Sequence, residues 1–408
     1  MAKKILLLVC LSMLSTYSMA KIEIEHDSIT CNELEELNVV SFYRNVGKVG
    51  NIIDRESLLN YNKGQEPSFI LSEQPSVFAY SDTGNEYGYS YFRMRGMDQT
   101  RVNMTMDGMP LNEGEDMGVY FSNYPDMIAS MHSVKIESGA GISGNGVAGY
   151  AGTIDFESVD LKRDTVSSVY VGYGSFNTFK SSVEYNSGFK NKWAVHLKVT
   201  QQQSDGYRQH AYNNSQSAFA KVGYSLSDRH SIDLLCFIGQ SRNGQGWIGS
   251  SLDEIMINNR SNGCSEVESD KFMQNINKIQ YKGWVNDNVA LTASLYYNQL
   301  KGHYYFDVDN FMHKVVDPTW QNTGEVDCYH LRHHMIGGNI AAMAYFRNFT
   351  LTTGVNASTF NRRHIGTNNL GSEEMWNNKG YKNDVNLFAK GEYRYNALKL
   401  AGNVQCKH

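Results

Sequence analysis

A run of closely spaced glycines from Gly139 to Gly152 constrains this chain more than any other segment. So many glycines leave few side chains to pack, so the backbone there turns tightly or lies close against other structure. Side chains alternate over 102–106 and 131–137 as they do in strands, and Asp107-Gly108 after the first run is typical of a hairpin turn. This stretch alone leaves open a glycine-rich hairpin in an ordinary α+β domain.

The neighbouring segments complete a small domain over 46–161. Asp54 is placed to cap a helix, and 67–71 predicts a second short helix. Strands are expected at 76–80 and 91–94, with a polar loop between them. We therefore expect an α+β domain of about four strands with small helices.

The composition narrows the possible function classes. The chain has 408 residues and a formal net charge of −5, which argues against a nucleic-acid-binding surface. It contains 26 Tyr and 5 Pro, a balance that favours strands and interfacial aromatic belts over a helical enzyme. After the first residues no apolar run reaches about 18 residues, so no transmembrane helix is expected. A membrane β-barrel is still possible, because its strands alternate apolar and polar side chains and contain no long apolar run.

The N-terminus has the pattern of a secretory signal peptide. Lys3 and Lys4 precede the apolar core 5–14, and the small-residue site Ser18-Met19-Ala20 follows. We expect cleavage after Ala20, which places the mature chain outside the cytoplasm. A membrane anchor is the weaker alternative because the apolar run is too short. Residues 21–45 are charged and are expected to be flexible, with one short extended run that is either an edge strand or a peptide for strand addition.

Apolar and polar side chains alternate along segments of 162–408 as they do in outer-membrane strands. Short turns join these segments on one side and long connections on the other. Long connections are expected at 202–215, 240–274, 300–332 and 360–382. An outer-membrane barrel requires this asymmetry, and a soluble β-sandwich is the weaker alternative. The eleven strands are expected near 167–174, 178–187, 192–201, 216–226, 230–239, 275–285, 288–299, 333–346, 349–359, 383–395 and 398–404.

Four motifs in order resemble the plug domain of TonB-dependent outer-membrane receptors. That family carries, roughly, I-R-G, then I-D-G-V-P, then I-E-V-x-R-G, then Y-G-x-x-A-x-G-G-x-I-N. Here Arg95-Gly96 matches the first motif and Asp107-Gly108-Met109-Pro110 the second, while 134–139 matches the third and 145–155 the fourth. The resemblance implies a mainly β fold, in which a small α+β plug domain over 46–161 precedes an antiparallel transmembrane β-barrel over 162–408.

The chain departs from the family pattern at Ser138, where the family usually has Arg. In the family that Arg and the Arg of the first motif, here Arg95, pair with barrel carboxylates and lock the plug to the barrel. The resemblance therefore implies that Arg95 is the surviving half of the lock. Its barrel partners are expected in strands that this chain does not contain.

Eleven expected strands are half of the roughly 22 that the family barrel implies. The chain ends in Gln405-Cys406-Lys407-His408, without the terminal aromatic residue that helps family members to assemble. An open sheet would leave two unpaired edges in lipid. We therefore expect a plug with the first half of a barrel, as in a truncated gene product.

The resemblance also implies a function and partners. A receptor of this family binds a scarce ligand outside the cell and is driven by TonB with its inner-membrane energising complex. It contacts outer-membrane lipid of a Gram-negative bacterium. A ferric siderophore is the first expected ligand and cobalamin the second.

Two groups of residues carry these expectations. The run 35–41 resembles the TonB box, and TonB is expected to bind Leu37, Asn38, Val39, Val40 and Ser41. The outward tips of the plug are expected to touch the ligand through Asp82, Asn85, Tyr87, Tyr89, Asn112, Glu113 and Tyr120.

No motif supports enzymatic chemistry, because the chain has no nucleophile elbow, P-loop or HExxH motif. Histidines in or beside the long connections could form a metal cluster, but solvated histidines are the more common case. Asp307-Val308-Asp309-Asn310 has only part of an EF-hand pattern, so neither metal nor cofactor is expected. A non-transporting structural or adhesion barrel and a secreted β-rich binding protein are the alternative functions.

Overall fold

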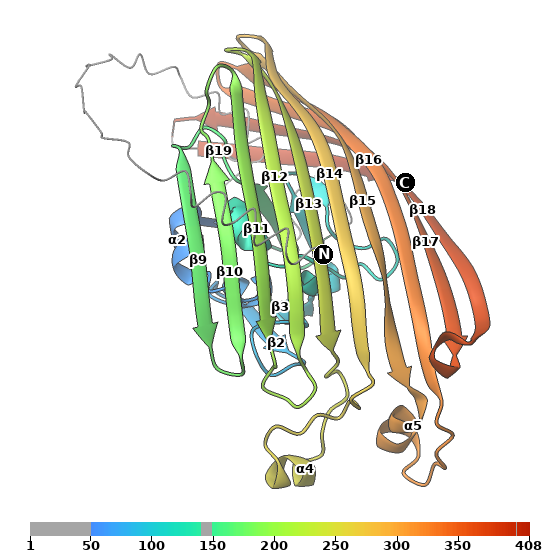
Figure 1. The fold of residues 1–408 in the computed structure, drawn as a ribbon. Helices are drawn as coiled ribbons and strands as arrows, with labels where there is room; N and C mark the ends of the chain where they lie inside the picture. Colours follow the sequence, from blue (N-terminus) through green and yellow to red (C-terminus); the bar gives the residue numbers. More distant parts are fainter. Residues whose placement is uncertain (1–49, 140–148, 397) are drawn as a thin grey trace, which may run out of the picture. The chain divides into compact units, whose positions relative to one another are not determined.

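The computed structural model describes residues 50–139, 149–396 and 398–408, all of which belong to one compact unit, Val39–His408. The expected signal peptide and the TonB-box-like run 37–41 lie outside the described residues. Two small sheets precede one large sheet (Figure 1). No helix among the described residues is long and apolar enough to cross a membrane.

The segment 50–161, called here the small domain, contains the two small sheets. A five-stranded sheet has the order β1-β7-β8-β5-β6 and a three-stranded sheet the order β2-β3-β4. The strands are β1 (Gly50–Asp54), β2 (Val77–Ser81), β3 (Ser90–Met94), β4 (Met97–Asp98), β5 (Val102–Met106), β6 (Met109–Pro110), β7 (Met131–Ser138) and β8 (Gly152–Ser158). The helices are α2 (Arg55–Tyr61), α3 (Pro67–Leu71) and the short turns η1 (Gln99–Arg101), η2 (Phe121–Asn123) and η3 (Met127–Ser130).

Local sequence signals explain several of these elements. The Asp54 side chain accepts a hydrogen bond from the Ser57 amide, so it caps α2 as expected. Asp107 and Gly108 both have positive φ, at 49° and 77°, which is the geometry of a tight hairpin turn between β5 and β6. β5 pairs parallel to β8. The expected α+β character of the small domain is therefore confirmed.

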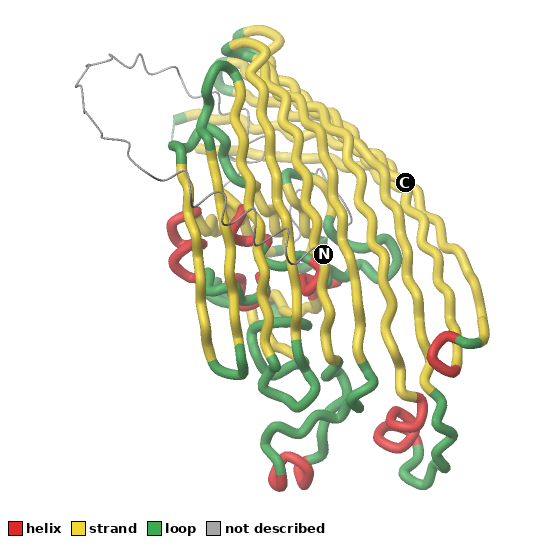
Figure 2. The backbone as a smooth tube through the Cα atoms, viewed as in Figure 1, coloured by secondary structure: helices red, strands yellow, loops and turns green. Residues whose placement is uncertain are grey.

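The large sheet has eleven antiparallel strands, each hydrogen-bonded to its neighbour in sequence (Figure 2). The expected fold class, a mainly β chain with eleven barrel-like strands, is confirmed. The strands are β9 (Val166–Gly174), β10 (Thr178–Asn186), β11 (Trp193–Ser204), β12 (Asn213–Ser227), β13 (His230–Gly244), β14 (Ser269–Asn286), β15 (Val289–Asp307), β16 (Val326–Phe346), β17 (Phe349–Asn368), β18 (Glu373–Tyr395) and β19 (Leu398–Lys407).

The expected connection at 360–382 was wrong, and that at 300–332 was too long. β17 and β18 continue as paired strands to the short turn η5 (Asn369–Gly371), and β15 runs to Asp307. In the β17–β18 extension alternation failed as a signal because most residues of both faces are polar. Only a strand with one apolar face shows a clear period of two. The remaining long connections carry the helices α4 (Leu252–Ile257) and α5 (Val308–Phe311) and the turn η4 (Met312–Val316).

The small domain and one face of the large sheet share a single hydrophobic core. Buried methionines of the small domain meet buried aromatic and aliphatic residues of β12 to β17. The small domain touches the same face of strands from β10 to β18, so the sheet curves around it. The opposite face carries exposed apolar side chains, among them Leu197, Val199, Ile238, Leu295 and Ile336.

The core predicts a clear stability difference between two methionines. Met104 on β5 is 0% exposed, whereas Met97 on β4 is 38% exposed. We expect Met104→Ala to lower the free energy of unfolding by roughly 2–5 kcal/mol, because the cavity cannot fully collapse. Met97→Ala is the matched control and is expected to cost less than about 1 kcal/mol. Guanidinium unfolding of the detergent-folded chain measures both, and equal losses would contradict the placement of Met104 in the core.

Candidate functional site

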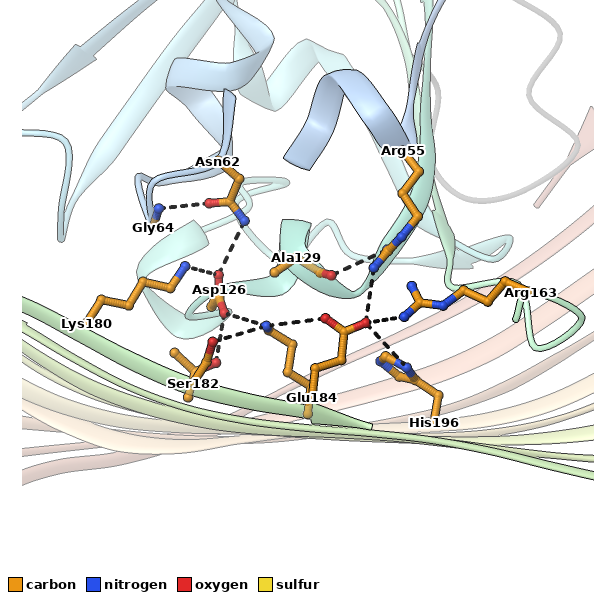
Figure 3. A network of polar contacts seen from close by, with 12 residues as sticks. Arg55, Asn62, Gly64, Asp126, Ala129, Arg163, Lys180, Ser182, Glu184 and His196 are labelled. Atoms are coloured by element: carbon orange, nitrogen blue, oxygen red, sulfur yellow. Dashed lines mark hydrogen bonds and ion pairs between the residues drawn. The ribbon is translucent and has the colours of Figure 1, made fainter. Parts of the chain in front are cut away.

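Asp126 anchors the small domain to the large sheet (Figure 3). It precedes η3 in a left-handed backbone conformation, with φ at 55°, and none of its side chain is exposed. Its carboxylate accepts hydrogen bonds from Lys180 Nζ on β10 at 2.6 Å and from Thr200 Oγ1 on β11 at 2.7 Å. Lys198 Nζ lies 3.7 Å away. Two ammonium groups thus face this enclosed carboxylate, and such pairing offsets the cost of burying a charge.

Glu184 on β10 makes the reciprocal contact, with the charges reversed (Figure 3). Arg55 of α2 donates to its Oε1 at 3.1 Å, and Arg163 donates to the same atom at 2.5 Å. Arg55 also donates to the Met131 carbonyl at 2.7 Å, so its guanidinium spans both domains. His196 and Lys198 of β11 lie about 4 Å from the carboxylate. The Asp126 and Glu184 groups form one continuous charged network across the interface.

The hairpin turn at Asp107 forms a second anchor. Asp107 accepts hydrogen bonds from the amide and the hydroxyl of Ser158, at 2.9 and 2.5 Å, and so joins the turn to the end of β8. Lys221 donates to the Ser158 hydroxyl at 2.8 Å, and Lys278 donates to the Asp107 carbonyl. Burial alone would raise the pKa of Asp107, but the lysines Lys221, Lys278 and Lys282 and the Ser158 hydroxyl lower it to about 2.

A third anchor joins the loop after β6 to β17. Arg362 is 4% exposed and pairs with the carboxylates of Glu113 and Glu115. His364 Nε2 lies 2.8 Å from Glu115 Oε2. Glu113, expected from the sequence to touch a ligand, is thus engaged with Arg362 in the described structure.

The first expected tip, the loop between β2 and β3, lies at the end of the sheet that carries the long connections. Asn85 Nδ2 donates to Ser204 Oγ on β11 at 3.2 Å, and Arg208 N donates to the Thr83 carbonyl at 3.2 Å. The Tyr87 hydroxyl donates to the Lys63 carbonyl at 3.0 Å. Asp82 is half-buried in the same loop.

The second tip, residues 112–120, lies at the same end of the sheet. Asn112 is 4% exposed, and its amide donates to the carbonyls of Val102 and Met117, which gives it a structural role. The Tyr120 hydroxyl donates to Asp116, and the ring of Tyr120 meets Tyr89 edge-on at 6.3 Å. Contact of either tip with a ligand stays a prediction.

Arg95, the expected half of a lock, is exposed and has a left-handed backbone with φ at 53°. Within the described ranges no ion pair involves it, and its role stays a prediction. The anchors that the structure shows come from other residues. Lys180, Ser182 and Glu184 stand at alternate positions of β10, and charged residues at that spacing on a membrane strand must face the interior. This spacing in the sequence could have predicted that these side chains face the plug.

Comparison with known proteins shows what this chain resembles. Residues 44–153 match the family model described as TonB-dependent Receptor Plug Domain. This segment is therefore a plug domain of the TonB-dependent receptor type, and part of a barrel-like antiparallel sheet follows it. That family consists of transporters rather than enzymes. No curated protein matches the chain in sequence.

Solved structures show the same fold at low sequence identity. The unliganded ferric citrate transporter FecA is 13% identical, with a TM-score of 0.72 over 88% of this chain and 56% of its own. The copper transporter OprC is 17% identical, with a TM-score of 0.69 over 88% and 55%. The ferric yersiniabactin uptake receptor FyuA from Yersinia pestis is 12% identical, with a TM-score of 0.66 over 89% and 56%. The chain thus spans about half the length of these structures.

The Asp126 anchor predicts a large effect from a small substitution. Asp126→Asn keeps the shape of the side chain but leaves Lys180 and Lys198 facing a neutral group in a buried site. We expect the free energy of unfolding to fall by about 3 kcal/mol, because unpaired buried charges are costly. Thermal unfolding in detergent and limited proteolysis of the plug measure the change. Asp164→Asn, at an exposed carboxylate, is the control, and an equal effect of both variants would contradict the anchor.

The Asp107 anchor predicts a pH dependence. Because its pKa lies below the ordinary value of 3.8, its stabilising contribution is present above that pH and is lost as the pH falls through about 2. We expect Asp107→Asn to cost on the order of 1–2 kcal/mol at neutral pH, and this difference to vanish at the acid end. Guanidinium unfolding across that pH range measures it. The exposed Asp228→Asn should show no such convergence, and a constant difference for Asp107→Asn would refute the assignment.

Proposed function

We propose that this chain works as a TonB-dependent receptor of the Gram-negative outer membrane that takes up a scarce ligand. One observation supports it above the others: a plug domain is paired through buried charges with one face of a sheet whose other face is apolar. An apolar outer face and a polar inner face are the pattern of outer-membrane strands. The signal peptide expected over 1–20 is consistent with this location.

The proposed energy source is TonB with its inner-membrane complex. TonB would capture the TonB-box-like run 37–41 by strand addition and pull on the plug from the periplasm. The plug is suited to such a movement, because its anchors to the sheet are ion pairs and hydrogen bonds rather than covalent bonds. Movement of the plug would then open a path for the ligand.

The proposed ligand is a ferric siderophore, with cobalamin as the second candidate. Both plug tips lie at the end of the sheet that carries the long connections, and their tyrosines and amides suit a polar chelate. Ferric citrate and ferric yersiniabactin appear in the names of matched structures, and copper appears in another. These names support a metal chelate and leave its chemistry to experiment.

Capture by TonB provides the test of the proposal. Proline lacks the backbone N–H that a paired strand donates, so Val39→Pro in the full chain should lower capture of the C-terminal domain of TonB by about tenfold or more. Val39→Thr keeps a β-branched residue and the N–H, and it is the matched control. Capture is measured by pull-down with purified TonB domain.

Three results would contradict the proposal. Equal capture of wild type and Val39→Pro would refute strand addition at this run. Recovery of the full chain in the soluble periplasmic fraction, rather than in outer membranes, would favour a secreted binding protein. Membrane recovery without any TonB capture would favour a structural or adhesion barrel.

A further inference from the structure

Six cations lie on the outer face of the large sheet, toward the end with the long connections. We call them the outer basic belt: Arg242, Lys271, Lys301, Arg332, Arg363 and Lys379. Each shares its face with an exposed apolar residue of the same strand or of the neighbouring one. Arg332 is four positions from Ile336, and Lys301 is six from Leu295. The six side chains therefore point away from the plug.

Strand register places the belt in two adjacent rows. Arg242 pairs with Lys271 across β13 and β14. Lys301, Arg332, Arg363 and Lys379 stand directly opposite one another across β15 to β18. Like charges in direct opposition on neighbouring strands repel. Within the described parts of β12 to β18, neither row contains Asp or Glu to offset them.

The belt differs in this respect from the cations of the inner face. Lys180 pairs with Asp126, Arg362 with Glu113, and Lys282 with Asp233. Among the described residues, none of the six belt cations makes an ion pair. Arg332 donates to His334, and Arg363 to the Asn377 amide oxygen, so even these two have only neutral partners. The belt cations are therefore available to an anion outside the chain.

The height of the belt indicates what faces it. The outward positions of β15 are mostly apolar from Val289 to Tyr297, and Gln299 ends this apolar part. Val289 and Gln299 are about 33 Å apart along the strand. At a strand tilt of 35–45° this corresponds to roughly 25 Å across the membrane, the height of the apolar band of outer-membrane barrels. Lys301 follows directly, at the level of the lipid headgroups.

A hollow of about 260 Å³ lies within the belt, lined by Asn214, Gln216, Gln240, Arg242 and Lys271. Two cations and three amides supply many hydrogen-bond donors to one space. Arginine and lysine bind phosphate oxygens through charge-assisted hydrogen bonds, and the arginine fork fits them in pairs. We propose that the outer basic belt binds the phosphate groups of a phosphorylated glycolipid in the outer leaflet, with the hollow at Arg242 and Lys271 as its principal site. This inference rests on the proposed outer-membrane location.

The test uses the full chain folded in detergent micelles and fluorescently labelled diphosphoryl lipid A as the probe. We expect binding of the wild type, measured by fluorescence anisotropy, to be at least about tenfold tighter for this lipid than for its dephosphorylated form. The double variant Arg242→Gln with Lys271→Gln should lose a similar factor. Lys190→Gln with Arg347→Gln removes the same charges from the short turns at the opposite end and should bind as the wild type does.

Three outcomes would overturn the proposal. They are equal binding of the dephosphorylated lipid, unchanged binding by the Arg242 and Lys271 variant, and an equal loss in the control variant. The comparison of the two lipids needs no variant, so it decides even if a variant fails to fold. Failure of the proposed function is read separately, from recovery of the chain in the soluble fraction, because the micelle assay does not depend on cellular location.

Discussion

Charge pairing across the boundary between the plug and the sheet is the constraint on which the described structure depends. The side chain of Asp126 has no exposed surface, and it is paired with Lys180 at 2.6 Å. Glu184 makes the opposite arrangement, since the carboxylate is on the sheet and Arg55 is on the plug. Neither partner can be buried as a charge without the other. The charged groups of the plug and those of the facing side of the sheet are therefore complementary.

The core around these charges is of a different kind. Met94, Met104, Met106, Met109 and Met131 are almost fully buried in the plug. Methionine is flexible and fills irregular gaps, so such a core supplies burial without strict directionality. The ion pairs are directional, so they define the position of the plug against the strands, which the core alone does not. An assembly that combines an adaptable core with polar anchors suits the plug movement proposed for uptake.

The same electrostatic reasoning separates the two faces of the sheet. Several cations of the inner face meet carboxylates of the plug or of a neighbouring strand, as Arg362 meets Glu113. Cations of the outer face, such as Lys301 and Arg332, stand next to one another with no carboxylate in their rows. Burial beside the plug demands an internal partner, whereas the proposed position at the membrane surface leaves the partner to the surroundings. The position of a lysine in the barrel thus decides which kind of partner it needs.

The sequence by itself determined the elements that depend on local patterns. Alternation located eleven strands, the cap at Asp54 located α2, and Asp107-Gly108 located a hairpin turn. It did not reveal the strand extensions around η5, because most residues of both faces there are polar. Only the tertiary structure decided the anchors. Glu113 meets a partner 249 residues away, and Asp126 meets one 54 residues away. Alternation of apolar and polar residues tells which face of the sheet a side chain occupies. Which opposite charge that side chain meets depends on strand register and on how the plug packs against the inner face of the sheet.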